Sequence, residues 1–210
     1  MQHIFPLLGI AGAIAIGAMS PGPSFLMVAR TAVASSRSSG LAAALGMGVG
    51  GVLFAIAALA GLQAAFTAIP GLYLVLRIAG GFYLVYLGCR IWRGAATPLM
   101  LRSETAGPGR TAARAFVLAL GTQISNPKAA VVYASVFAAF LPRTFPVLLG
   151  VGTVVIIFII ETGWYALVAA VLSADGPRAA YLRYKAWVDR SAGGVMGILG
   201  IRLITSARGG

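Results

Sequence analysis

The chain has 210 residues, of which 60% are hydrophobic and only 10% are charged. Soluble domains carry about 25% charged residues, and a water-soluble core of this size could not hide so much apolar sequence. The composition therefore indicates an integral membrane protein and excludes an ordinary soluble domain.

The net charge of +12 would suit a nucleic-acid-binding protein, but the basic residues lie in short stretches between apolar runs. That spacing follows the positive-inside rule and argues against nucleic acid as a partner. The single cysteine, Cys89, excludes an intramolecular disulfide, and we expect it to be buried at a helix end. The single histidine, His3, leaves no set of residues for a His-ligated metal or an enzyme's nucleophile–His–acid triad. We expect no metal, no cofactor and no enzymatic activity.

Six apolar segments follow one another, and a transmembrane helix needs about 20 such residues. In chain order they are residues 4–30, 39–67, 71–93, 114–141, 146–173 and 191–207. The first is interrupted at Pro21-Gly22-Pro23 and the fourth at Asn126-Pro127. The sequence predicts an all-α membrane protein with six transmembrane helices, in which helices 1 and 4 are broken at mid-membrane.

Two polar segments connect these runs. Residues 94–113 form the long connection, which divides the chain into a first repeat at 1–93 and a second repeat at 114–210. Residues 174–190 link the last two runs, and we expect Asp175 and Asp189, like Glu104, to be solvated loop charges.

Lys and Arg counts near the ends of the spans predict topology. One side collects eleven basic residues and the other collects three. We therefore expect both termini to lie outside the cytoplasm and the 94–113 connection to be cytoplasmic. The larger set is Arg30, Arg37, Arg90, Arg93, Arg102, Arg110, Arg114, Arg178, Arg183, Lys185 and Arg190, and the smaller set is Arg143, Arg202 and Arg208.

The two halves of the chain repeat. A shift of 104 residues places Pro23 on Pro127, Gly46 on Gly150 and Gly48 on Gly152. Each half holds three spans, an odd number, so the second half enters the membrane in the opposite sense. This is the inverted-repeat plan of many secondary transporters.

The breaks at 21–23 and 126–127 predict a binding site. Irregular backbone is tolerated at mid-membrane only where it is buried in protein or lines a water-filled cavity. The freed N–H groups and the positive end of each following half-helix suit an anionic group such as a carboxylate. The alternative is that both breaks are simple proline kinks that serve packing.

Lys128 and Glu161 lie at the same depth as the breaks. A charge at the bilayer centre costs about 2.5–3.5 kcal/mol on insertion scales, so neither side chain should face lipid. In one interpretation the two form an ion pair that holds two helices together. In the other, Lys128 receives a substrate carboxylate, and Glu161 takes a proton or a substrate ammonium group.

Further polar residues near this layer are candidates for substrate contact. We select Ser24, Gln123 and Tyr165, and Asn126 because its side chain can cap the new half-helix. The remaining polar residues of the layer are Ser20, Ser125, Tyr133 and Thr162. Glycines should permit close helix packing, namely Gly46, Gly48, Gly50, Gly51, Gly61, Gly80 and Gly81.

At these residues the sequence resembles the LysE/RhtB family of amino-acid exporters, over nearly the whole chain. The motifs that carry the resemblance are "SPGPSFLMVA" (20–29), "GLAAALGMGVG" (40–50), "GGFYLVYLGCRIWR" (80–93), "NPKAAVVYASVFAAFLP" (126–142) and "GGVMGILGIRLI" (193–204). The resemblance implies a six-span transporter of the bacterial-type cytoplasmic (inner) membrane, driven by proton antiport. Its motifs point to Pro21, Gly22, Pro23, Asn126, Pro127 and Lys128 as functional residues.

Two features depart from the family pattern. The second span carries no charge after its glycines and has Phe54 there, which favours a neutral or apolar substrate over a basic one. Glu161 matches no family motif, and we assign it as the candidate for proton coupling.

The function predicted from the sequence is a secondary active exporter of amino acids or small derivatives, working by alternating access. Its partners are the amino acid, protons and the lipid bilayer. The alternative is an exporter of another small solute or a metal ion on the same scaffold, and a homo-oligomer is left open.

Overall fold

Eight helices make up the described part of the chain, which comprises residues 4–20, 22–69, 72–97, 111–142 and 144–206 of a computed structural model. The prediction of an all-helical protein is confirmed. In chain order the helices are α1 (Ile4–Met19), α2 (Pro23–Ala34), α3 (Arg37–Ala68), α4 (Leu72–Gly94), α5 (Ala112–Ile124), α6 (Pro127–Phe140), α7 (Val147–Leu172) and α8 (Asp175–Ser206).

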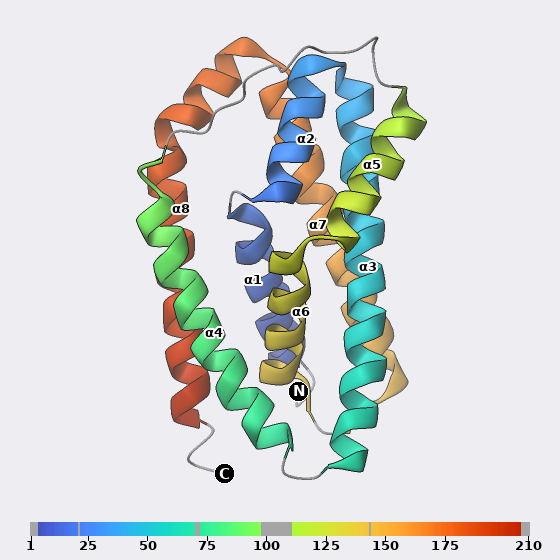
Figure 1. Ribbon diagram of the computed structural model, residues 1–210, viewed down its shortest axis with the longest axis vertical. Coiled ribbons are helices and arrows are strands. Elements are labelled where there is room, and N and C mark those ends of the chain that lie inside the picture. Colours follow the sequence, from blue (N-terminus) through green and yellow to red (C-terminus); the bar gives the residue numbers. More distant parts are fainter. Residues whose placement is uncertain (1–3, 21, 70–71, 98–110, 143, 207–210) are drawn as a thin grey trace.

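The helices run up and down the long axis of the molecule (Figure 1). α1 and α2 lead from the lower end to the upper end, α3 returns, and α4 rises again. The second half begins at the upper end, so α5 with α6 descends, α7 rises and α8 descends. α1 therefore begins and α8 ends at the same end of the bundle.

Three described helices have the length and apolar composition of a membrane span, namely Arg37–Leu62, Leu74–Gly94 and Val147–Leu172. α1 and α2 pass together as a fourth span, bent by 56°. α5 and α6 have 13 and 14 residues, and each alone is too short to cross about 30 Å of hydrocarbon.

Both helix pairs break where the sequence predicts it. Proline stands at the start of α2 and of α6, where its missing N–H costs nothing and its fixed φ suits the first helical turn. Before it, Gly22 is extended, with φ −157° and ψ −170°, and Asn126 is extended, with φ −82° and ψ 106°.

A polar layer separates two apolar cores. The lower core contains Ile14 of α1, Ala55 of α3, Val132 of α6 and Ile157 of α7. The upper core contains Phe25 of α2, Met47 of α3, Ala119 of α5 and Tyr165 of α7. The breaks fall between these two sets on their own helices, so the freed backbone lies inside the protein.

α8 corrects two predictions and α4 a third. The segment 174–190 was expected to be a connection, but α8 begins at Asp175 and has 32 residues. Asp189 is not a solvated charge, because it is only 2% exposed and pairs with Lys185 one turn away, Nζ to Oδ2, at 2.7 Å. Cys89 is exposed on α4 rather than buried. The predicted connection 94–113 lies outside the described residues at 98–110, as does Glu104.

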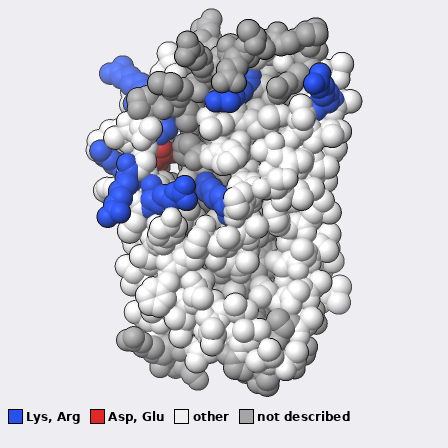
Figure 2. Space-filling view, viewed as in Figure 1, with Lys and Arg blue, Asp and Glu red and all other residues white. Residues whose placement is uncertain are grey.

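Basic side chains gather at one end of the molecule (Figure 2). They lie on the upper part of the face shown, where α4 ends and α8 begins, while the described residues visible on the lower part of that face are uncharged.

Glycines bring α4 and α8 into backbone contact. A β-carbon at Gly193 would lie 2.7 Å from the carbonyl oxygen of Gly88, and one at Gly200 would lie 2.6 Å from that of Gly81. Small residues allow membrane helices to approach in this way. We call this contact the glycine seam.

Replacing Gly193 with alanine should destabilise the protein, because the methyl group would meet the backbone of α4. We expect the free energy of unfolding to fall by about 1–3 kcal/mol, as for other overpacked sites. The measurement is the unfolding midpoint in mild detergent.

The matched control is Gly197→Ala in the same helix, where a β-carbon meets nothing within 4 Å. Helix propensity alone favours that change by about 1 kcal/mol or less. Equal destabilisation by both variants would contradict the role of the glycine seam.

Candidate functional site

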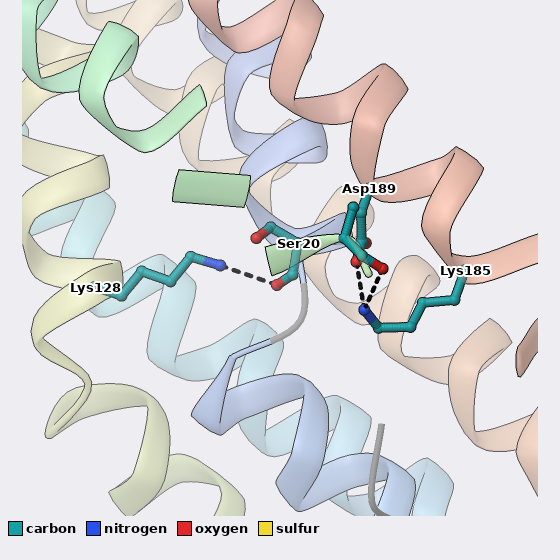
Figure 3. Close-up of polar contacts among 5 residues, drawn as sticks. Ser20, Lys128, Lys185 and Asp189 are labelled. Carbon is teal, nitrogen blue, oxygen red and sulfur yellow. Dashed lines mark hydrogen bonds and ion pairs between the residues drawn. The ribbon is translucent and has the colours of Figure 1, made fainter. Parts of the chain in front are cut away.

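Lys128 bridges the two broken helices. Its ammonium group donates to the carbonyl oxygens of Ser20 at 2.9 Å and of Gly17 at 3.3 Å. These carbonyls belong to the end of α1, where the last turn of a helix has no partners of its own and carries partial negative charge. Lys128 thus caps the end of α1 from the start of α6 (Figure 3).

A chain of hydrogen bonds ties the breaks together. The Asn126 side chain accepts from the backbone N–H of Lys128 at 3.0 Å and so caps α6. Its Nδ2 donates to the hydroxyl of Ser24 at 2.9 Å, and that hydroxyl donates to Oε1 of Gln123 at 2.5 Å. Side chains from α2 and from both sides of the second break therefore form one network.

Glu161 of α7 ends this network. Its carboxylate accepts from Nε2 of Gln123 at 3.3 Å and from the hydroxyl of Tyr133 at 3.1 Å. Glu161 is 3% exposed, so burial leaves it dependent on these two donors. The ring of Tyr133 packs against those of Phe54 and Phe137.

Glycines of α3 make room for the network. A β-carbon at Gly51 would lie 2.7 Å from the hydroxyl oxygen of Tyr133 and 3.1 Å from Cγ of Glu161. One at Gly50 would lie 2.6 Å from Cγ of Gln123. α3 thus supports the site through the absence of side chains at these two positions.

Lys128 and Glu161 do not pair with each other in the described part of the chain. The Lys128 ammonium is bonded to α1 carbonyls, while Glu161 is bonded to Gln123 and Tyr133. Of the two interpretations offered by the sequence, the direct ion pair is not the one that this conformation adopts.

Two adjoining hollows meet at the breaks. The inner pocket, of about 30 Å³, reaches Gln123, Tyr165 and Glu161 and has room for about one or two water molecules. The outer cavity has about 560 Å³, within the range of small-molecule sites. Both hollows are lined by Ser20, Gly22, Asn126 and Lys128.

The outer cavity lies between two walls. One wall is formed by the break between α1 and α2 together with the start of α6, and the other is formed by α4 and α8. Towards the lower core the walls converge, because a β-carbon at Gly80 of α4 would lie 2.8 Å from the carbonyl oxygen of Ser135 in α6.

Most of the predicted site residues surround these hollows. Gly22, Ser24, Gln123, Asn126, Lys128, Glu161 and Tyr165 line the inner pocket, while Pro23 and Pro127 line the outer cavity. Pro21 lies outside the described residues. Ser125 is exposed. The hydroxyl group of Thr162 lies next to Gly48 of α3, and Thr162 lines neither hollow.

Three charged residues of the outer cavity were missed as site residues. Arg90, Lys185 and Asp189 line it, although their places in the sequence suggested only topology-setting charges or a solvated connection. The spacing of four between Lys185 and Asp189, after the helix-start signal Asp175-Gly176-Pro177, could have indicated a paired helical face.

Comparison with known proteins gives one family. The LysE type translocator family matches residues 15–207. A threonine efflux protein of Salmonella typhi is 32% identical over 91% of this chain and 93% of its own length, and one of Escherichia coli K12 is 31% identical over the same shares. A leucine efflux protein of Salmonella choleraesuis is 34% identical over 65% of this chain and 63% of its own length. No solved structure matches.

Asn126→Ala should destabilise the protein, because it removes both the cap of α6 and the bond to Ser24. An N-cap contributes about 1 kcal/mol and an interhelical hydrogen bond in a membrane about 0.6 kcal/mol, so we expect a loss of about 1–2 kcal/mol. Unfolding in mild detergent measures it. Asn126→Ser keeps a capping oxygen and should lose less, and an equal loss in both variants would refute the cap.

Proposed function

The chain belongs to the LysE type translocator family, and we propose that it exports neutral amino acids from the cell as a secondary transporter. The family resemblance read from the motifs is confirmed, and it makes the protein a transporter and not an enzyme. The mechanism rests on one observation: the Lys128 ammonium group binds the end of α1 from the start of α6, beside a cavity large enough for an amino acid.

The substrate class is inferred from relatives and from the cavity. Threonine efflux proteins are among the relatives that match most of the chain, and a leucine efflux protein matches part of it. Both amino acids are neutral, which agrees with the uncharged second span. We therefore propose threonine and similar small neutral amino acids as substrates.

We propose six membrane crossings in two inverted halves, 1–93 and 114–210. The support is that α1 with α2 and α5 with α6 are matched broken pairs that run in opposite directions (Figure 1). In addition, α3 packs on its counterpart α7, and α4 on its counterpart α8. α8 has 32 residues, more than the about 20 that cross the hydrocarbon, and its first turns slant across the upper end of the bundle (Figure 1), so they would lie in the headgroups and water.

We propose that the basic end faces the cytoplasm and that both termini lie outside it, in a bacterial-type inner membrane. The gathering of Lys and Arg at the end opposite the start of α1 supports this orientation (Figures 1 and 2). The outer cavity, with Arg90 and Lys185, then lies towards the cytoplasm, from which an exporter takes its substrate.

In this conformation the substrate carboxylate would bind at Lys128. Two donors of its ammonium group are used by α1 carbonyls, and an ammonium group has three. The start of α2 at Gly22 and Pro23 borders the same cavity and adds the positive end of a half-helix.

Glu161 would couple transport to protons. The inner pocket is too small for an amino acid, so Glu161 would act behind Lys128 and contact the substrate only after a conformational change. We propose that proton binding at Glu161 alternates with substrate binding, while one half of the protein rocks against the other.

Purified protein in liposomes should carry threonine, and its flux should respond to a pH gradient. Lys128→Ala should lower the flux at least tenfold, because it removes the ammonium group that donates to the substrate carboxylate and that caps α1. Glu161→Gln, which keeps the shape of the side chain, should abolish the response to the gradient. Radiolabelled threonine uptake measures both.

The control is Arg93→Ala, an exposed basic residue at the same end that lines neither hollow. It should keep at least about half of the flux. Wild-type flux in both Lys128→Ala and Glu161→Gln would remove the proposed mechanism.

The substrate class can be tested in cells. Expression should let cells tolerate toxic concentrations of threonine or of another neutral amino acid, and the Lys128→Ala variant should not. The measurement is growth across a panel of single amino acids. Tolerance confined to lysine and arginine would contradict a neutral substrate.

A further inference from the structure

The outer cavity offers an acid that the mechanism above does not use. Among the described residues that line it, the one acidic side chain is Asp189, and Glu161 is confined to the inner pocket. A zwitterionic amino acid brings an ammonium group as well as a carboxylate. In this conformation the acid within reach of that ammonium group is therefore Asp189.

Asp189 is buried but incompletely bonded. Its Oδ2 accepts from Lys185 at 2.7 Å, whereas its buried Oδ1 has no hydrogen-bond partner in the described part of the chain. A buried carboxylate oxygen without a donor is unfavourable. Because a carboxylate has about four acceptor positions, a second ammonium group could bind while Lys185 stays in place. Lys185 also donates to the Ala95 carbonyl oxygen, which holds it on the wall at the end of α4.

Lys128 and Asp189 lie on opposite walls of the cavity. Figure 3 shows Lys128 pointing to Ser20 from α6, and Asp189 with Lys185 approaching the same break from α8. Arg90 of α4 adds a further cation to the lining. A substrate with its carboxylate at Lys128 would therefore present its ammonium group to the α8 wall.

We infer that Asp189 is the residue that recognises the α-ammonium group when the amino acid first occupies the outer cavity, with Lys185 as its positioning residue. This inference rests on the proposed function and adds to it the selection of zwitterions over simple carboxylates. Glu161 keeps its separate role behind the breaks.

The test compares threonine with 3-hydroxybutanoate, which is threonine without its amino group. Both compounds are added as unlabelled inhibitors of labelled threonine uptake into liposomes. With wild-type protein, threonine should inhibit at a concentration at least tenfold lower than 3-hydroxybutanoate. Asp189→Asn should raise the KM for threonine at least tenfold and should reduce the preference over 3-hydroxybutanoate to less than about threefold. Equal inhibition by the two compounds in the wild type would overturn the inference without any variant.

A second variant separates recognition from folding. Asp189→Asn leaves Lys185 buried without its partner and can fail to fold for that reason. The double variant Asp189→Asn with Lys185→Met removes both charges, and it should fold yet keep the raised KM and the lost preference. A double variant with the KM and preference of the wild type would show that the pair is only structural. Absence of amino-acid flux in the wild type would instead overturn the proposed function itself.

Discussion

The structure depends on one constraint: two helices are interrupted inside an apolar protein, and their free backbone groups need partners. Lys128 meets this need at the end of α1, where it binds the carbonyl oxygens of Gly17 and Ser20. Asn126 meets it at the start of α6. In the first case the partners come from the opposite half of the chain, so Lys128 holds the two halves together where their helices are interrupted.

The polar layer is narrow because apolar packing closes it on both sides. On α7, Ile157 belongs to the lower core and Tyr165 to the upper core, and Glu161 lies one turn from each. α3 crosses the same layer with Gly50 and Gly51, whose missing side chains let Gln123 and Tyr133 approach. Firm packing above and below this layer allows a few hydrogen-bonded polar groups to remain ordered within otherwise apolar surroundings.

The sequence predicted the elements whose signals are local. Pro23 and Pro127 mark where the helices restart, and the Asn-Pro pair predicts the cap of α6, so both breaks lie where they were expected. The partners of Lys128 could not be predicted, because they are main-chain carbonyls more than 100 residues away. Asp189 was missed because a polar composition was interpreted as a connection, although its pairing with Lys185 made a buried helical face possible.

The glycine seam has a mechanical consequence. Since α4 and α8 approach to backbone contact and neighbouring side chains such as Trp92 and Val85 pack against the same glycines, we expect the two helices to move together. In the lower part of the bundle, Gly80 of α4 contacts Ser135 of α6, while above that point the outer cavity separates α6 from α4 and α8. We expect the contact at Gly80 to act as a pivot, about which a small tilt of α4 and α8 would bring Asp189 towards Lys128 and narrow the outer cavity.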